Sequence, residues 1–142
     1  MRDNNMYTEL VCRYAGNNDF VHPQSPASKN EICAAEEKLN VKFPEELKKL
    51  LSEMNGDKFL CLSVSGIIEN NLDLRSAYKD FVDLSNFLFV AENGCGDYYG
   101  YHIENGMVLS SPIYIWEHES FKNKAVADNL EEMIKLYYQD KI

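Results

Sequence analysis

Three groups of residues in the second half of the chain have side chains that could bind a metal ion, bind phosphate or act as a nucleophile. The first, Glu117-His118-Glu119, combines two carboxylates with an imidazole, and these groups bind divalent metal ions. On a β-strand, however, Glu117 and Glu119 would share one face while His118 points to the other, so the three side chains would not converge on one ion. We therefore predict no metal site and interpret the motif as the solvated end of a strand.

The second motif, Gly94-Cys95-Gly96-Asp97, has some features of a phosphate-binding loop. A P-loop needs a longer glycine spacing and a lysine, whereas this segment ends in a carboxylate. A tight turn between two strands is the better interpretation. In such a turn Asp97 either hydrogen-bonds the backbone amides or presents its charge to a partner.

The third motif is a nucleophilic pair that Cys95 could form with His102 or His118, because such pairs are assembled in space rather than along the chain. No local nucleophile motif surrounds Cys95. The cysteines, at positions 12, 33, 61 and 95, also lack the C-x-x-C spacing of zinc and redox sites, which indicates free thiols in a reducing compartment. We predict no catalytic residue and no cofactor, and a small enzyme that depends on Cys95 stays open as a third class of function.

The stretch from residue 86 to residue 121 has a more distinctive composition, with five carboxylates, eight aromatic side chains and no lysine or arginine. Interleaved on strands, these groups make an electronegative and partly apolar surface, which suits a basic protein better than a polyanion. We predict a partner-binding surface formed by Glu92, Asp97, Tyr99, Tyr101, Glu104, Trp116, Glu117 and Glu119.

The tyrosines of this stretch cannot all be exposed. Tyr99 and Tyr101 lie on one face of their strand, and Tyr98 and His102 lie on the other, so one set must pack against the core. Trp116 likewise suits the core, although tryptophan and tyrosine are enriched at the centres of interfaces.

Charge and hydropathy exclude several classes of ligand. The chain has 14 basic and 23 acidic residues and a formal net charge of -9, which opposes direct binding of nucleic acid or of an anionic membrane. The N-terminus has no apolar signal-peptide core, and the longest uncharged apolar run, residues 59–68, is too short to span a bilayer. These features predict a cytoplasmic protein.

Helix signals flank this stretch on both sides. Ser28 with Glu31 forms a capping box for a helix that ends at Asn40, Pro44 opens a second helix, and Asn55-Gly56 ends it. A further capping box, Asp128 with Glu131, starts a closing helix whose apolar residues include 126, 130, 133, 134 and 137. Residues 1–27 are less regular, although Met6, Leu10, Val11 and Tyr14 could form one short amphipathic helix.

Strand signals fill the middle of the chain. The apolar run 59–68 predicts a buried strand, which a turn at Asn70-Asn71 and a helical pattern over 74–81 follow. Further strands are predicted over 87–91, 98–103, 107–109 and 113–117, with a tight hairpin at Asn105-Gly106. With 142 residues, 45% of them hydrophobic, and no linker or repeat, the chain is expected to form one α+β domain.

Four segments in this order resemble the SUKH superfamily, which groups yeast cell-wall synthesis regulators with bacterial proteins interpreted as immunity proteins against polymorphic toxins. They are EICAAEEKLNVK with FPEELKKLLSEMNG, FLFVAENGCGDYYGYHIENG, IYIWEHES and VADNLEEMI. The resemblance covers about Ser28 to Tyr138. It implies a central antiparallel sheet flanked by helices, and a non-enzymatic role in binding proteins.

The resemblance also extends to single positions. The proline and Asn-Gly of the second helix fall on Pro44 and Asn55-Gly56, the Gly-Asp before an aromatic strand falls on Gly96-Asp97, and the later tryptophan falls on Trp116. The family's common double glycine after the second helix is here Gly56-Asp57. The family has no shared catalytic residues to transfer.

These observations lead to two hypotheses about function. In the first, the protein neutralises a cognate toxin domain, a basic nuclease, by placing its acidic surface against the cationic surface with which a nuclease binds phosphates. In the alternative, it is a regulatory or scaffold module of the cell-wall-regulator type. The sequence predicts neither the oligomeric state nor the identity of the partner.

Overall fold

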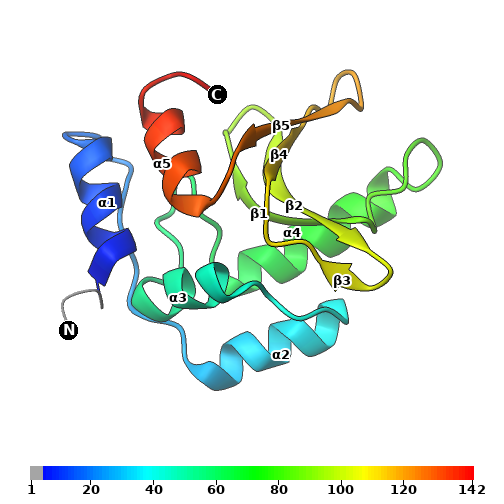
Figure 1. The fold of residues 1–142 in the computed structure, drawn as a ribbon, viewed down its shortest axis with the longest axis horizontal. Coiled ribbons are helices and arrows are strands. Elements are labelled where there is room, and N and C mark those ends of the chain that lie inside the picture. The colour runs from blue at the N-terminus through cyan, green and yellow to red at the C-terminus, as the bar shows by residue number, and fades with distance from the viewer. Residues whose placement is uncertain (1–4) are drawn as a thin grey trace.

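A computed structural model describes residues 5–142 of the chain, and in this part five helices surround a five-stranded sheet (Figure 1). The helices are α1 (Met6–Ala15), α2 (Lys29–Leu39), α3 (Glu45–Glu53), α4 (Val64–Ala77) and α5 (Leu130–Tyr138). The strands are β1 (Phe87–Glu92), β2 (Tyr98–Glu104), β3 (Met107–Val108), β4 (Ile113–Trp116) and β5 (Asn123–Ala127). The predicted α+β class, with a sheet flanked by helices, is confirmed.

The sheet is antiparallel, with the order β1-β2-β4-β5, and β3 pairs with the far end of β2. The predicted hairpin is confirmed, because Asn105 and Gly106 both have positive φ, 52° and 78°. Strand β5 was not predicted. Its side chains are mostly exposed, so its sequence lacks the apolar alternation that marks a half-buried strand, and it forms by pairing with β4.

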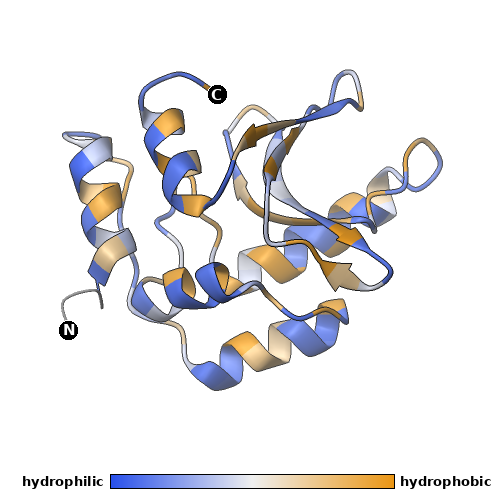
Figure 2. Cartoon of the chain, viewed as in Figure 1, coloured by the Kyte–Doolittle hydropathy of each residue, from blue (hydrophilic) through white to orange (hydrophobic). Residues whose placement is uncertain are grey.

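Alternating side chains give the sheet two apolar faces. Phe87, Phe89 and Trp116 pack on one face in a small cluster that includes Leu74 of α4. The opposite face carries Leu88, Val90, Tyr99, Tyr101, Ile113 and Ile115, which join the main core with α1, α2, α3 and α5. In Figure 2, orange and blue segments alternate along the helices, as expected for helices that bury one side and expose the other.

The helix starts follow the capping signals closely. The Ser28 capping box is present, with Glu31 N to Ser28 Oγ at 3.1 Å and Ser28 N to Glu31 Oε1 at 2.8 Å. Two starts are displaced by one residue from their predicted places. Pro44 is the N-cap of α3 rather than its first residue, and Asn129 rather than Asp128 caps α5 by accepting from Glu132 N at 2.8 Å.

The N-terminal segment is more regular than predicted. The short helix is confirmed as α1, whose Tyr7, Leu10 and Val11 are buried in the main core. It packs against α3 and α5, and Glu53 of α3 accepts hydrogen bonds from the first turn of α1 at Tyr7 N. Residues 1–4 of the segment lie outside the described residues.

The predicted strand over residues 59–68 is wrong. Only an isolated bridge joins Cys61 to Ala91, and the run then enters α4, which Ser63 caps by accepting from Gly66 N at 3.0 Å. A short continuous apolar run fits a buried strand and a buried helix equally well, and the capping serine decides for the helix. The asparagines interpreted as a turn lie inside α4, where Asn71 is fully buried.

Buried Asn71 closes the outer edge of β1. Its amide donates to the Phe89 carbonyl at 2.9 Å and accepts from Phe89 N at 2.8 Å, as a neighbouring strand would. Arg75 donates to the Phe87 carbonyl at 2.9 Å, and residues 60–62 bond Val90 and Glu92. The edge of β1 is therefore satisfied by α4 and by the loop before it.

Candidate partner-binding surface

Strand register brings four of the five predicted carboxylates to one end of the sheet. Glu92 is paired with Tyr98, and Tyr98 is paired with Trp116, so Glu92, Asp97 and Glu117 lie at the same end of three adjacent strands. Glu119 lies in the turn that follows β4. Glu104 ends β2 at the opposite end, six residues from Tyr98 and hence about 20 Å away at the rise of a strand. We call Glu92, Asp97, Glu117 and Glu119 the acidic end.

Asp97 is held by a specific set of hydrogen bonds. Its Oδ1 lies 2.7 Å from His118 Nδ1 and accepts from His118 N at 3.1 Å, and its Oδ2 accepts from Asn93 Nδ2 at 3.2 Å. Burial raises the pKa of the Asp97 carboxyl, but the hydrogen bonds from His118 and Asn93 lower it by more, so the net pKa lies below its ordinary value. Asp97 therefore carries its charge at neutral pH.

The Gly94-Cys95-Gly96-Asp97 segment is a tight turn, as predicted. Two of its amides donate to Asn93 rather than to Asp97, since Asn93 Oδ1 accepts from Cys95 N at 2.9 Å and from Asp97 N at 3.3 Å. Gly96 is required here because it has φ +100°, and a Cβ would lie 2.9 Å from the His118 ring. The turn and His118 are thus packed as one unit.

Glu117, His118 and Glu119 do not continue a strand, because β4 ends at Trp116 and these residues form the turn to β5. Glu117 Oε1 accepts from Ser120 Oγ at 3.2 Å, while His118 turns back to Asp97. Among the residues that the structure describes, no three metal-binding side chains cluster together. The Cys95 thiol and the two histidines considered as its partners share no hydrogen bond within residues 5–142.

Three aromatic residues of the predicted surface are buried instead. The side chains of Tyr99, Tyr101 and Trp116 have no exposed area, so they cannot touch a partner without opening the core, and we correct the prediction accordingly. Tyr101 donates from its hydroxyl to Glu46 Oε2 at 2.7 Å, which joins β2 to α3. Alternation required one set of tyrosines to face inward, and the set that includes Tyr99 does so because α1, α3 and α5 cover that face.

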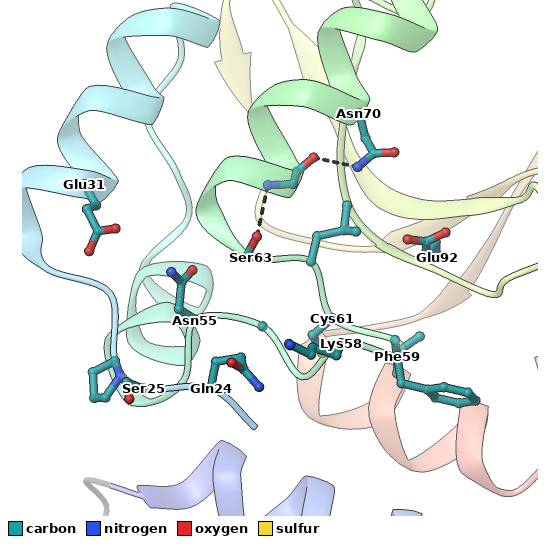
Figure 3. Close-up of a pocket in the computed structure, with 15 residues that line it drawn as sticks. Gln24, Ser25, Glu31, Asn55, Lys58, Phe59, Cys61, Ser63, Asn70 and Glu92 are labelled. Atoms are coloured by element: carbon teal, nitrogen blue, oxygen red, sulfur yellow. Dashed lines mark hydrogen bonds between the residues drawn. The ribbon is translucent and has the colours of Figure 1, made fainter. Parts of the chain in front are cut away.

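A groove of about 660 Å³ lies beside the acidic end (Figure 3). It opens between the segment before α2, the loop after α3 and the first turn of α4, and Glu92 closes one side of it. Its polar lining residues include Gln24, Ser25, Glu31, Asn55, Lys58, Ser63 and Asn70. Sequence reasoning missed this groove because its walls come from segments far apart in the chain.

The base of the groove is shaped by Gly56-Asp57, where the chain departs from the double glycine. Gly56 has φ +81°, and a Cβ there would lie 2.7 Å from Ser63 N. Asp57 Oδ1 accepts from the amides of Phe59, Leu60 and Cys61 at 2.9, 2.8 and 3.0 Å. The aspartate thereby fixes the loop that a second glycine would leave without a side-chain acceptor.

Glu92 is the one predicted residue that lines the groove. Burial raises the pKa of its carboxyl, and within the described part of the chain no side chain forms an ion pair with it. A cation placed in the groove beside Glu92 would counter this effect, since an opposite charge favours the ionised carboxylate.

The fold and these surfaces define a small α+β domain that presents carboxylates on fixed turns at one end of its sheet. Over residues 29–134, which is more than half of its length, the chain matches the family model described as SMI1-KNR4 cell-wall, SUKH_6. The chain therefore belongs to the SMI1-KNR4 (SUKH) family, as its sequence segments indicated. A search of curated proteins finds no match. Among the described residues, no helix has the length and apolar character needed to cross a membrane.

Proposed function

We propose that this protein is a non-enzymatic immunity protein that binds and neutralises a cognate toxin domain, a basic nuclease. Membership of the SUKH family is the observation that carries the proposal, because the family includes proteins interpreted as toxin immunity proteins. The net charge of -9 supports a cationic partner.

The acidic end is the surface that we assign to the toxin. It presents Asp97 ionised and fixed by His118, and Glu119 exposed to solvent. A nuclease displays lysine and arginine to hold phosphates, and carboxylates placed against them speed association and exclude the substrate. Glu104 is left out of the surface because it lies at the other end of β2.

The test uses the protein encoded by the neighbouring gene, provided that it contains a toxin-like domain. That domain is titrated with this protein by calorimetry at low and raised salt, and its activity is measured in parallel. We expect salt-weakened binding and loss of toxin activity. Glu117→Lys with Glu119→Lys should weaken binding at low salt by roughly ten- to a hundredfold and flatten its salt dependence.

The matched control is Glu104→Lys with Glu37→Lys, which makes the same charge change at exposed sites away from the acidic end. Equal loss of affinity in both double variants would mean that only net charge matters. Unchanged affinity in the Glu117 and Glu119 variant would refute the electrostatic mechanism.

A regulatory or scaffold role is the second candidate, and the description of the matched family as cell-wall proteins favours it. In that case the neighbouring toxin-like domain would not bind, and a pull-down with the wild-type protein would recover a signalling protein whose purified form binds directly.

A further inference from the structure

Two phenylalanines outside the predicted surface form an exposed aromatic pair. Phe81, in the segment between α4 and β1, is 71% exposed, and Phe121, in the turn between β4 and β5, is 37% exposed. Their ring centroids lie 6.1 Å apart, with an angle of 31° between the rings. These two loops lie far apart in the sequence, and the structure brings their rings together at the surface.

The pair rests on a buried aromatic base. Phe121 stacks on Trp116 with ring centroids 6.2 Å apart, and it forms a T-shaped pair with Tyr78, with ring centroids 5.7 Å apart. Tyr78 in turn contacts Trp116 at 5.2 Å, and Trp116 is fully buried. Aromatic rings held on a rigid base lose little conformational entropy on binding, and such rings are typical of the energetic centres of interfaces.

The backbone of Phe121 has a conformation that is unfavourable for a bulky side chain. Its φ is +62°, in the left-handed region, where bulky side chains are strained and glycine or asparagine is not. Two backbone hydrogen bonds hold it there, from Phe121 N to Glu117 O and from Glu117 N to Lys122 O, both 2.8 Å. A strained aromatic side chain that is also partly exposed points to a role in binding.

The loops that carry the two rings are acidic. They contain Asp80, Asp83, Glu117 and Glu119 against Lys79 and Lys122, and no ion pair links these residues within residues 5–142. Four carboxylates and two ammonium groups leave the patch negative, which complements a cationic partner. An arginine of a partner can contact both the aromatic rings and the carboxylates, because its planar guanidinium stacks on aromatic faces and pairs with carboxylates.

We propose that Phe81 and Phe121 form the apolar centre of the surface that binds the basic partner, with arginine side chains of the partner stacked on the rings. This inference rests on the proposed function and makes it more specific. It moves the aromatic part of the interface from the buried Tyr99, Tyr101 and Trp116 to these two residues. Phe121 lies in the same β4–β5 turn as Glu117 and Glu119, and Phe81 contacts Phe121 from the segment between α4 and β1.

The direct test is an NMR titration with a capped hexa-arginine peptide at low salt, repeated with a capped hexa-lysine peptide. We expect the arginine peptide to shift the ring signals of Phe81 and Phe121 and to bind several-fold more tightly than the lysine peptide. Phe81→Ser and Phe121→Gly should each weaken binding at least fivefold. The control is Phe20→Ser, because Phe20 is equally exposed, at 72%, but lies outside the patch.

Phe121→Gly relieves the backbone strain at this position. Phe81→Ser removes a ring that is mostly exposed to water, so this variant should keep the unfolding midpoint of the wild type. Peptide binding that both variants leave unchanged would overturn the proposal. So would sedimentation showing that the wild type dimerises and Phe81→Ser is monomeric, since the patch would then bind a second copy.

The same variants separate this inference from the proposed function. If the wild-type protein fails to bind and inhibit the neighbouring toxin-like domain, the proposed function fails. If the wild type inhibits that domain and Phe81→Ser inhibits it equally well, only the aromatic centre is refuted.

Discussion

Replacing Asp57 is expected to reveal how the groove loop is held. Asp57 has no exposed area, and its Oδ1 accepts from three consecutive amides, of which Leu60 N and Cys61 N are buried. An unsatisfied buried amide costs about 1–3 kcal/mol, so Asp57→Ala loses roughly 2–6 kcal/mol at these two donors. Removal of a desolvated carboxylate offsets part of this loss, and we expect a net destabilisation of about 3 kcal/mol.

Asp57→Asn separates the hydrogen bonds from the charge. The asparagine keeps an Oδ1 acceptor for the same amides, so its cost at pH 7 should be only about 1 kcal/mol. Burial is the main cause that raises the pKa of Asp57, and the amide hydrogen bonds oppose it only in part. The native carboxyl therefore takes up a proton before the unfolded one does, and wild type should gain stability relative to Asp57→Asn as the pH falls from 7 toward 4.

Urea unfolding followed by tryptophan fluorescence measures all of these differences, because Trp116 is the single tryptophan and is fully buried. The matched control is Asp19→Ala, an exposed aspartate whose loss should change stability by less than about 0.5 kcal/mol. A cost below about 1 kcal/mol for Asp57→Ala would refute the reasoning, because the three amides would then be satisfied without the carboxylate. A difference between wild type and Asp57→Asn that does not change with pH would contradict the raised pKa.

Substitutions at three further positions test the sheet, its edge and the start of α2, each by urea unfolding. Gly100→Ala would place a Cβ against the Leu88 carbonyl oxygen of the neighbouring strand, so we expect a loss of more than about 3 kcal/mol or no folded protein in the soluble fraction. Asn71→Ala would leave the buried N–H and C=O of Phe89 without partners on the β1 edge, costing about 2–4 kcal/mol, whereas a cost near zero would mean that water replaces the amide. Ser28→Ala removes the capping box of α2 and should cost about 1 kcal/mol, while Ser28→Gly should cost only a few tenths.

The parts of the fold that the sequence predicted correctly are those with local signals. Ser28 with Glu31 and the Asn105-Gly106 hairpin depend on residues within three positions of one another, so their physics is visible in a short window. The run over residues 59–68 has no local signal of this kind. A continuous apolar run fits both the 3.6-residue period of a helix and the two-residue period of a strand. Strand β5 is set by its partner β4 and not by its own side chains, so no local pattern marks it.

The sequence identifies the residue types of the candidate site but not where the fold places them. Acidic residues must be exposed or paired, and four of the five do gather at one end of the sheet, because hairpins bring the ends of adjacent strands together. Which face of β2 is covered depends on helices that come from distant parts of the chain, so the sequence left the exposure of Tyr99 and Tyr101 undecided. The contact between Phe81 and Phe121 is likewise non-local.

The two surfaces at the ends of α4 share a physical property that stability does not explain. Beside the first turn of α4, Glu92 keeps a half-buried carboxylate without a described ion-pair partner, and burial raises its pKa. Beyond the last turn, Phe121 keeps a strained backbone and a partly exposed ring. The buried carboxylate and the exposed ring each cost free energy in the isolated protein, and both costs fall when a cationic partner is bound, since a cation favours the ionised Glu92 and a guanidinium covers the ring. A basic partner that spans both ends of α4 would relieve both costs at once, which supports the proposal that the partner binds on this side of the molecule.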